Sequence, residues 1–146
     1  MIMLRIWISA IATIAALTAC APMATQPQSA AAPRIEATPG KAVVFIVRTR
    51  PDLSYLATPL SVDDQMIGAS YAGTYFRLEL PPGRHRISGY GQDNGAMTLD
   101  VQPDRVYFIQ HTVSGSWRAT NPHSFFSVMN EGRARAALAR AVPAAG

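Results

Sequence analysis

The sequence contains a single cysteine, Cys20, in 146 residues. An exported domain held together by disulfide bonds usually carries an even set of cysteines, and one cysteine cannot form an intramolecular bridge. The chain is therefore not a disulfide-rich scaffold. Because Cys20 also stands where an N-terminal apolar segment ends, both observations point to a role in processing rather than in folding.

Charged residues are scarce as well, since Asp, Glu, Lys and Arg together make up 15% of the chain. That fraction is low for a cytosolic domain and ordinary for an exported one. The 13 basic residues outnumber the 9 acidic ones only slightly, and they form no long tract. This balance does not indicate nucleic acid as a partner.

Sequence motifs for catalysis and cofactor binding are missing. No Gly-x-Ser-x-Gly places a serine nucleophile on a strained turn, and no glycine-rich phosphate loop precedes a helix. His85, His111 and His123 are not spaced as metal ligands with each other or with a carboxylate. The neighbours Asp63 and Asp64 are best explained as turn residues that bond backbone N–H groups. We therefore expect no enzyme, no metal and no cofactor.

The first 19 residues have the three parts of a secretory signal peptide. A short start with one positive charge is followed by the apolar residues 6–17 and then by two small residues. The apolar stretch is shorter than the roughly 20 residues that a membrane-spanning helix needs. We expect cleavage between Ala19 and Cys20.

The string Leu17-Thr18-Ala19-Cys20 resembles the lipobox of bacterial lipoproteins, in which an aliphatic residue and two small residues precede a cysteine. The resemblance implies that the Cys20 thiol receives a diacylglyceryl group and that the membrane is a partner through this lipid. The alternative is an ordinary signal peptide with a chance cysteine. In Gram-negative cells an aspartate after the cysteine tends to retain lipoproteins at the inner membrane. Residue 21 is alanine, so we expect the periplasmic face of the outer membrane.

Residues 20–40 are expected to form the lipidated cysteine and a flexible linker. The stretch APMATQPQSAAAPRIEATPG contains four prolines and no apolar period, which is typical of a linker. The alternative is that residues 34–38 pack as an irregular strand.

Residues 41–141 are predicted to form one mainly β domain, followed by a disordered tail at residues 142–146. Short apolar runs and period-two alternation, with turn signals between them, are typical of an antiparallel β-sandwich. We expect the carboxypeptidase-regulatory-like or transthyretin-like kind. The pattern predicts strands at residues 41–48, 58–62, 65–67, 74–80, 84–90, 97–101, 105–114 and 124–129, and one C-terminal helix at residues 131–140.

The segment Pro81-Pro82-Gly83 is predicted to be the tight turn of a hairpin between residues 74–80 and 84–90. With the motifs around it, the chain resembles an uncharacterised family of small bacterial lipoproteins that have a single β-sandwich domain and a Pro-Pro-Gly-x-His hairpin. The motifs are the apolar strand 43–47, Ile67-Gly68, Gly73, Tyr75, Phe76, Pro81-Pro82-Gly83 and His85. The turn at 63–65 departs from the family, because Asp-Asp-Gln replaces the usual Asp-Gly-Lys. The family has no assigned activity, so the resemblance implies location and fold alone.

Arg77, Arg84 and Arg86 are expected on the outward face of that hairpin, because side chains alternate between the two faces of a strand. Three arginines on one side would bind an anionic ligand or partner. The alternative is a solvated face on which Glu79 relieves repulsion across the strands.

Large aromatic side chains are the other candidates for a partner surface. Phe125 and Phe126 are adjacent in a strand, so one faces away from the core, and we expect the C-terminal helix to cover it. The leading hypothesis is a non-catalytic binding or scaffolding module for an envelope protein. The alternative is a module that contacts peptidoglycan or another glycan through Trp117, Tyr90 and the arginines. A hydrolase is a distant third.

Overall fold

The computed structural model describes residues 33–145 apart from 53, 55, 92–94 and 116–121. The predicted signal peptide, Cys20 and most of the predicted linker lie outside these residues. The described part is mainly β, as predicted. Its elements are β1 (Ala42–Arg48), β2 (Thr58–Val62), β3 (Gln65–Ser70), β4 (Thr74–Leu80), β5 (Gly83–Ser88), β6 (Ala96–Val101), β7 (Arg105–Ser114), β8 (His123–Val128), α1 (Glu131–Leu138) and β9 (Val142–Pro143).

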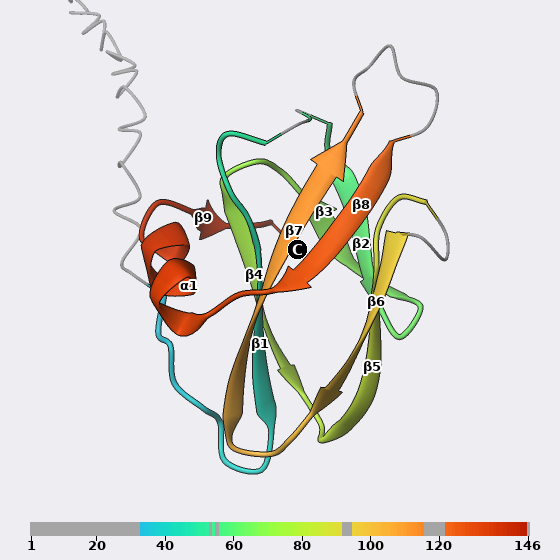
Figure 1. The fold of residues 1–146 in the computed structure, drawn as a ribbon. Helices are drawn as coiled ribbons and strands as arrows, with labels where there is room; N and C mark the ends of the chain where they lie inside the picture. The colour runs from blue at the N-terminus through green and yellow to red at the C-terminus, as the bar shows by residue number, and fades with distance from the viewer. Residues whose placement is uncertain (1–32, 53, 55, 92–94, 116–121, 146) are drawn as a thin grey trace, which may run out of the picture.

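The strands form two sheets that pack face to face, with α1 on the outer side of one of them (Figure 1). The larger sheet has the order β8-β7-β1-β4-β9 and the smaller one has the order β3-β2-β5-β6. The smaller sheet is antiparallel throughout, as expected for the predicted sandwich. The larger sheet is mixed, because β1 runs parallel to β7 and β4 runs parallel to β9.

Strand β1 is buried along its whole length because it is covered on both faces. Val44 and Ile46 lie between the two sheets, and Val43, Phe45 and Val47 lie under α1. This explains why the strand is apolar at successive positions instead of alternating. Burying each of these side chains contributes roughly 1.5–3 kcal/mol. The strand predicted at residues 41–48 is confirmed, and it is the central strand of the larger sheet.

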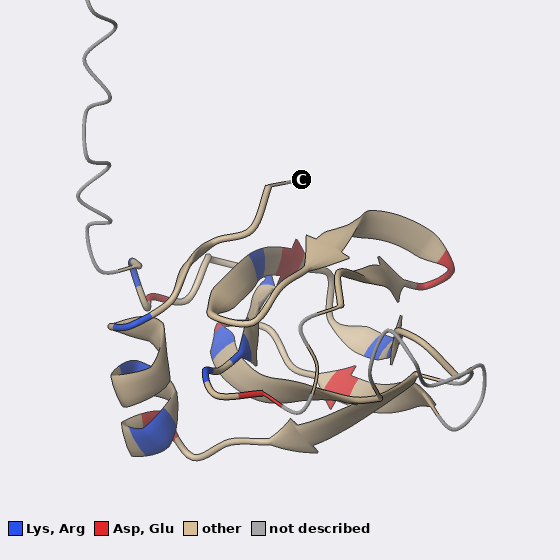
Figure 2. Cartoon of the chain, turned by 90° about the horizontal axis from the view of Figure 1, so that it is seen from above, with Lys and Arg blue, Asp and Glu red and all other residues tan. Residues whose placement is uncertain are grey.

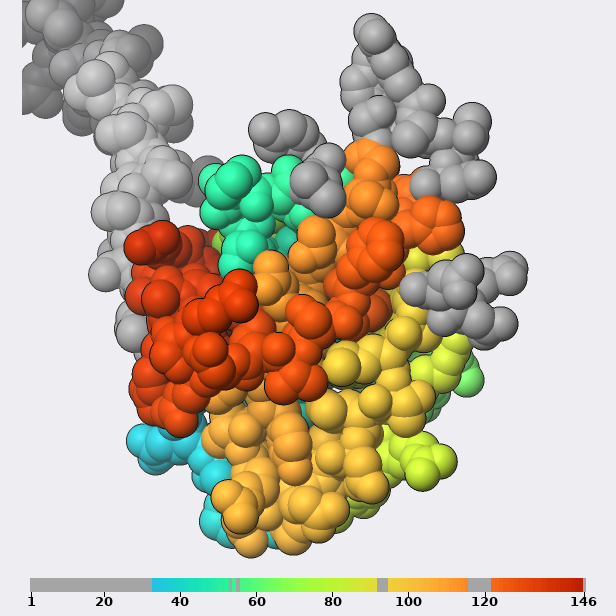
Figure 3. All heavy atoms as spheres, in the orientation of Figure 1, coloured from blue at the N-terminus to red at the C-terminus, as the bar shows by residue number. Residues whose placement is uncertain are grey.

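Helix α1 begins after Asn130, whose side chain accepts a hydrogen bond from the backbone N–H of Arg133. The cap satisfies one of the N–H groups that a helix start leaves without a partner. Ala134 and Leu138 are the buried residues of the helix, so Leu138 is its one large apolar anchor. Figure 3 shows α1 and the C-terminal segment packed against the rest of the domain.

The connection between β4 and β5 is not the predicted hairpin. Strand β4 pairs with β1 in the larger sheet, and β5 pairs with β2 and β6 in the smaller sheet. The segment Pro81-Pro82-Gly83 therefore leads the chain from one sheet to the other. Gly83 has φ +133°, a backbone conformation that glycine adopts without strain.

Both ends of the described chain are more closely held than the sequence predicts. Ile35 packs against the apolar cluster under α1, and the Thr38 hydroxyl donates a hydrogen bond to Glu79. At the other end β9 pairs with β4, and the backbone N–H of Ala144 donates to Tyr75 at 2.8 Å. The predicted disordered tail is therefore wrong for residues 142–145, because they add to the edge of the larger sheet. No helix in the described residues is long and apolar enough to cross a membrane.

Candidate anion-binding site

The three arginines expected on one face lie on opposite sides of the sandwich. Arg77 is two residues after Tyr75 in β4, so both side chains lie on the face of the larger sheet that carries α1. Arg84 and Arg86 alternate with the inward His85 and so lie on the outer side of the smaller sheet. The predicted common face is wrong because β4 and β5 belong to different sheets.

Two of these arginines also have acidic partners. Arg77 forms an ion pair with Glu79 at 2.9 Å, and Arg86 lies 3.5 Å from the carboxylate of Asp64. Arg84 stands opposite Asp100 in the register between β5 and β6. Each positive charge is thus close to a negative one, which weakens the attraction of these arginines for an external anion.

His85 fastens the turn between β2 and β3 to β5. Its Nδ1 donates to a carboxylate oxygen of Asp63 at 2.6 Å, and its Nε2 donates to the carbonyl of Pro81 at 2.8 Å. Burial lowers the pKa of His85, but the bonds to Asp63 and Pro81 outweigh it, so the pKa lies above 6.5. The pKa of Asp63 is lowered by the backbone N–H of Arg86 and by His85. The His85–Asp63 pair, called the latch below, therefore has a structural role, because it holds the turn between β2 and β3 against β5.

Asp63 and Asp64 are the central residues of the turn, and both have positive φ, at 51° and 63°. Positive φ at both positions is the geometry of a type I′ hairpin turn, in which aspartate is tolerated. The turn predicted at this place is confirmed. No group of three or more His, Cys, Asp or Glu side chains among the described residues is close enough to hold a metal.

A second polar cluster surrounds His111 inside the sandwich. The ring nitrogens of His111 lie 3.1 Å from the hydroxyl of Ser70 and 3.0 Å from the hydroxyl of Ser124. Its ring stacks on Phe126 with the centroids 4.8 Å apart. Burial, with a contribution from the charge of Arg48, lowers the pKa of His111 to about 4. The ring is therefore neutral at neutral pH.

Arg48 is the charged centre of the same region and is fully buried at the end of β1. It forms an ion pair with Asp52 and donates hydrogen bonds to the carbonyls of Ser54, Leu56 and Ser70. These bonds hold the chain that follows β1 against the sheet. In the described residues every buried side-chain nitrogen or oxygen has a hydrogen-bond partner. Such completeness is what a stable buried polar network requires.

The contact between Ser124 and His111 has the distance of a nucleophile–base pair. Ser70, His111 and Ser124 are nevertheless almost completely shielded from solvent. A substrate has no access to these hydroxyls in this structure. We therefore interpret the cluster as a structural element of the core.

The aromatic candidates do not form a common surface. Phe125 is 54% exposed, so the expectation that the C-terminal helix covers it is wrong. The helix instead covers β1, Tyr75 and Phe108, nearer the centre of the larger sheet. The Tyr90 hydroxyl donates to the carbonyl of Ala57 at 3.0 Å and thereby holds a loop. Trp117 lies outside the described residues.

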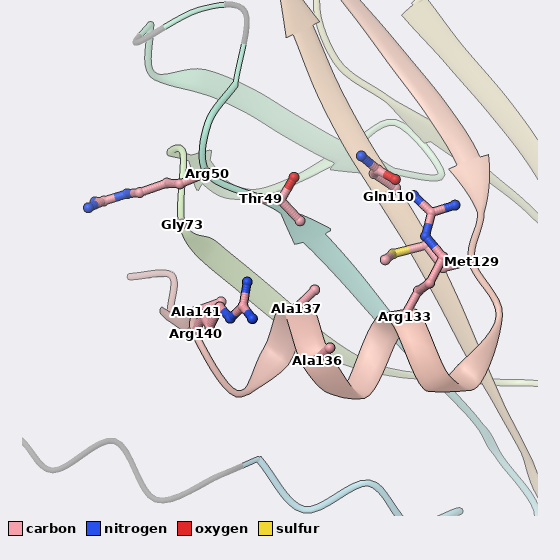
Figure 4. Close-up of a pocket in the computed structure, with 10 residues that line it drawn as sticks. All are labelled: Thr49, Arg50, Gly73, Gln110, Met129, Arg133, Ala136, Ala137, Arg140 and Ala141. Carbon is pink, nitrogen blue, oxygen red and sulfur yellow. The ribbon is translucent and has the colours of Figure 1, made fainter.

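A pocket of about 460 Å³ lies between α1 and the larger sheet (Figure 4). The pocket is lined by residues that follow β1, by β7 and by α1, on the face of the domain shown in Figure 3. The lining contains three arginines and no acidic residue. The lining residues are Thr49, Arg50, Gly73, Gln110, Met129, Arg133, Ala136, Ala137, Arg140 and Ala141.

The arginines of the pocket come from two parts of the chain. Arg133 belongs to α1, and Arg140 lies two residues beyond the end of the helix. The two arginines are seven residues apart, which corresponds to two helical turns. In Figure 4 the Arg133 side chain points from the helix toward Gln110 on β7. Neither Arg133 nor Arg140 forms an ion pair with an acidic residue in the described part of the chain.

Arg50 lies at the rim of the pocket and is fixed by a hydrogen bond from its Nε to the carbonyl of Ala72, at 2.8 Å. Its side chain passes over Gly73. A Cβ atom at Gly73 would come within 2.5 Å of the Arg50 Nε, and the φ of Gly73 is +86°. Both the position and the conformation therefore require glycine.

The remaining surface of the pocket is small and apolar, with one methionine and three alanines. Thr49 and Gln110 add neutral hydrogen-bonding groups. Arginine is the residue best suited to bind carboxylate or phosphate through paired N–H groups. The pocket therefore has the chemistry to hold a phosphate or carboxylate that is attached to a short apolar stem.

No pattern in the sequence predicted this pocket. The spacing of Arg133 and Arg140 was the available signal for a charged face on the predicted C-terminal helix. Compared with known proteins, the chain matches no family model, no curated protein and no solved structure.

Proposed function

We propose that this protein is a lipid-anchored lipoprotein of the cell envelope, held at the periplasmic face of the outer membrane. Its β-sandwich is a non-catalytic binding module, and the pocket lined by Arg50, Arg133 and Arg140 binds an anionic group of its partner. The observation that carries the proposal is the presence of Arg133 and Arg140, neither of which has an ion-pair partner in the described residues, in a pocket whose lining contains no carboxylate.

The lipid anchor is supported by the sequence. An N-terminal apolar segment ends in Leu17-Thr18-Ala19-Cys20, and the chain has no other cysteine. Each acyl CH₂ buried in a membrane contributes about 0.8 kcal/mol, so two or three chains anchor a protein durably where a single chain does not.

Binding of an anion is supported by the charge of the pocket. Arg77 and Arg86 are partly neutralised by Glu79 and Asp64, whereas the described residues provide no ion-pair partner for Arg133 and Arg140. A bound phosphate or carboxylate would supply the missing negative charge. Hydrogen bonds between ionised groups are roughly twice as strong as neutral ones.

The test is a calorimetric titration of the mature lipidated protein in detergent micelles with glycerol 1-phosphate and with succinate. We expect at least one probe to bind, and the double variant Arg133→Gln/Arg140→Gln to weaken its affinity at least tenfold. The double variant Arg84→Gln/Arg86→Gln removes the same charge from the other sheet and should bind as the wild type does. Absence of binding of both probes, or an equal loss in the control, would contradict the proposal.

A second candidate function is contact with peptidoglycan. Next to the arginine pocket is a hollow lined by Pro51, Asp52, Tyr71 and Ala72, and Arg50 lines both. Tyr71 is 51% exposed, and an exposed aromatic ring is a suitable platform for a sugar. Sedimentation with purified sacculi tests this candidate, which requires Tyr71→Ala to reduce binding.

A further inference from the structure

We infer that the anion bound in the arginine pocket is the phosphate of an anionic phospholipid in the membrane to which Cys20 is anchored. This inference rests on the proposed function, because it names the ligand of the same pocket. It makes the domain lie against the membrane through α1 instead of standing clear of it.

The first step is the place where the chain enters the domain. Ile35 packs in the same apolar cluster as Leu138 of α1, and it shares a shallow hollow with Glu131 and Arg135. Figures 1 and 2 both show the N-terminal described segment beside the helix. The side of the domain that is connected to the anchor is therefore the side that carries α1.

The second step is the length of the chain between the lipid and the domain. Twelve residues, 21–32, lie between Cys20 and Pro33. They span at most about 45 Å when fully extended, and about 20 Å on average as a flexible coil. A short tether keeps a site at a high effective concentration of ligands near its anchor, so even a weak site for headgroups is filled.

The third step is the distribution of charge over the domain. Arg133 and Arg140 lie on the α1 side, whereas the turn with Asp63 and Asp64 lies at the opposite end in both Figure 1 and Figure 2. The Asp64 side chain is highly exposed there. An anionic surface attracts the arginines of the first side, whereas the carboxylates of the second side are already close to His85 and Arg86, so the surface orients the domain with α1 toward the headgroups.

The pocket is suited to a single phosphate group, because it is a hollow and not a flat charged surface. The three arginines border a hollow of about 460 Å³ with an apolar floor made of Met129 and alanines. The guanidinium groups of Arg133 and Arg140 suit the phosphate oxygens, whereas Arg50 points away in Figure 4, and the apolar lining suits the glycerol carbons. The ligand therefore enters the pocket as an individual headgroup.

The experiment uses the mature lipidated protein in nanodiscs. A cysteine introduced as Ala139→Cys, at the exposed end of α1, is the only free thiol because the lipid occupies that of Cys20. Thr98→Cys, on the exposed side of β6, is the matched control position. A fluorophore on each thiol reports contact with quencher lipids that carry the quenching group in the headgroup region.

We expect quenching at position 139 to be strong in phosphatidylcholine that contains phosphatidylglycerol and weak in phosphatidylcholine alone. The label at position 98 should remain unquenched in both. Arg133→Gln/Arg140→Gln should lower the membrane-contact equilibrium roughly 25-fold, at about fivefold for each arginine. Arg84→Gln/Arg86→Gln should leave it unchanged.

Other results overturn the inference in distinguishable ways. If glycerol 1-phosphate binds but quenching at position 139 ignores phosphatidylglycerol, the ligand is a soluble phosphate and the proposed function stands. If muropeptides bind at the pocket while lipid has no effect, the ligand is peptidoglycan. If neither lipid nor any soluble anion binds, the inference and the anion-binding part of the proposed function both fall.

Discussion

The imidazole Nδ1 of His85 lies 2.6 Å from a carboxylate oxygen of Asp63, which joins the turn between β2 and β3 to strand β5. The same ring reaches the carbonyl of Pro81 through Nε2, so both ring nitrogens donate hydrogen bonds. A ring with two donors is protonated. The latch is therefore an ion pair whose strength depends on pH.

The first prediction is the pH range in which this latch stabilises the domain. The raised pKa of His85 contributes stability below about pH 6.5, and this contribution is lost as the pH rises through the pKa of the folded state. The lowered pKa of Asp63 contributes stability above about pH 4, which is lost as the pH falls through its folded pKa. The contribution is therefore largest between about pH 4 and 6.5.

Urea unfolding at several pH values measures this contribution. Asp63→Asn keeps a side chain that tolerates positive φ but removes the charge. We expect the variant to lose about 1 kcal/mol near pH 5.5, because Asp63 is half exposed and the pair is screened. Its stability should also change less than that of the wild type between pH 6 and 8. The same pH profile in both proteins would show that the pair does not act as described.

The second prediction concerns the buried ion pair of Arg48 and Asp52. Arg48→Met leaves a buried carboxylate without its partner and releases the carbonyls of Ser54, Leu56 and Ser70. We expect a loss of about 3–5 kcal/mol in the free energy of unfolding. Arg105→Met, at an exposed position at the start of β7, should cost less than about 0.5 kcal/mol. Equal costs would mean that the buried network does not fasten the chain after β1.

The third prediction concerns the connection between the sheets. Gly83 has φ +133° and open space where a Cβ would lie, so a substitution meets backbone strain without a steric clash. We expect Gly83→Val to lower the free energy of unfolding by about 1–3 kcal/mol. Gly132→Ala, in α1, should be neutral or stabilising by up to about 1 kcal/mol. An unchanged melting temperature for Gly83→Val would contradict the positive φ.

The fourth prediction concerns processing. Cys20→Ala should abolish palmitate labelling and leave uncleaved precursor in the membrane fraction, because both steps require the thiol. Immunoblotting and labelled palmitate in whole cells measure the two effects. Normal labelling of the variant would rule out the lipoprotein hypothesis.

Local patterns in the sequence predicted the individual strands better than their partners. The apolar run at residues 41–48 identified β1, and the predicted strand at residues 84–90 matches β5, in which His85 and Ile87 are buried. The turn chemistry of Pro81-Pro82-Gly83 showed that the chain reverses there, but local chemistry does not determine which strand pairs with the next. The assignment of β4 and β5 to different sheets is a long-range property, and it moved Arg77 away from Arg84.

The arginine pocket is also a product of long-range folding. The seven-residue spacing of Arg133 and Arg140 was visible in the sequence, whereas Arg50 and Gly73 reach the pocket only because β1 and β4 pair. Arginine is mostly exposed in proteins, so the residue type of Arg48 gave no sign that it is buried. It is buried because the chain that follows folds back and supplies carbonyl partners.

The most direct test of the central claim, that the pocket binds an anion, is to observe its arginine side chains during titration. Nuclear magnetic resonance of the Arg Nε–H groups, in mature lipidated protein in detergent micelles, follows each guanidinium separately as glycerol 1-phosphate is added. The account predicts saturable shifts for Arg133 and Arg140 and none for Arg84. Shifts at Arg84 and Arg86 instead, or no shift at Arg133 and Arg140 at saturating concentration, would contradict it.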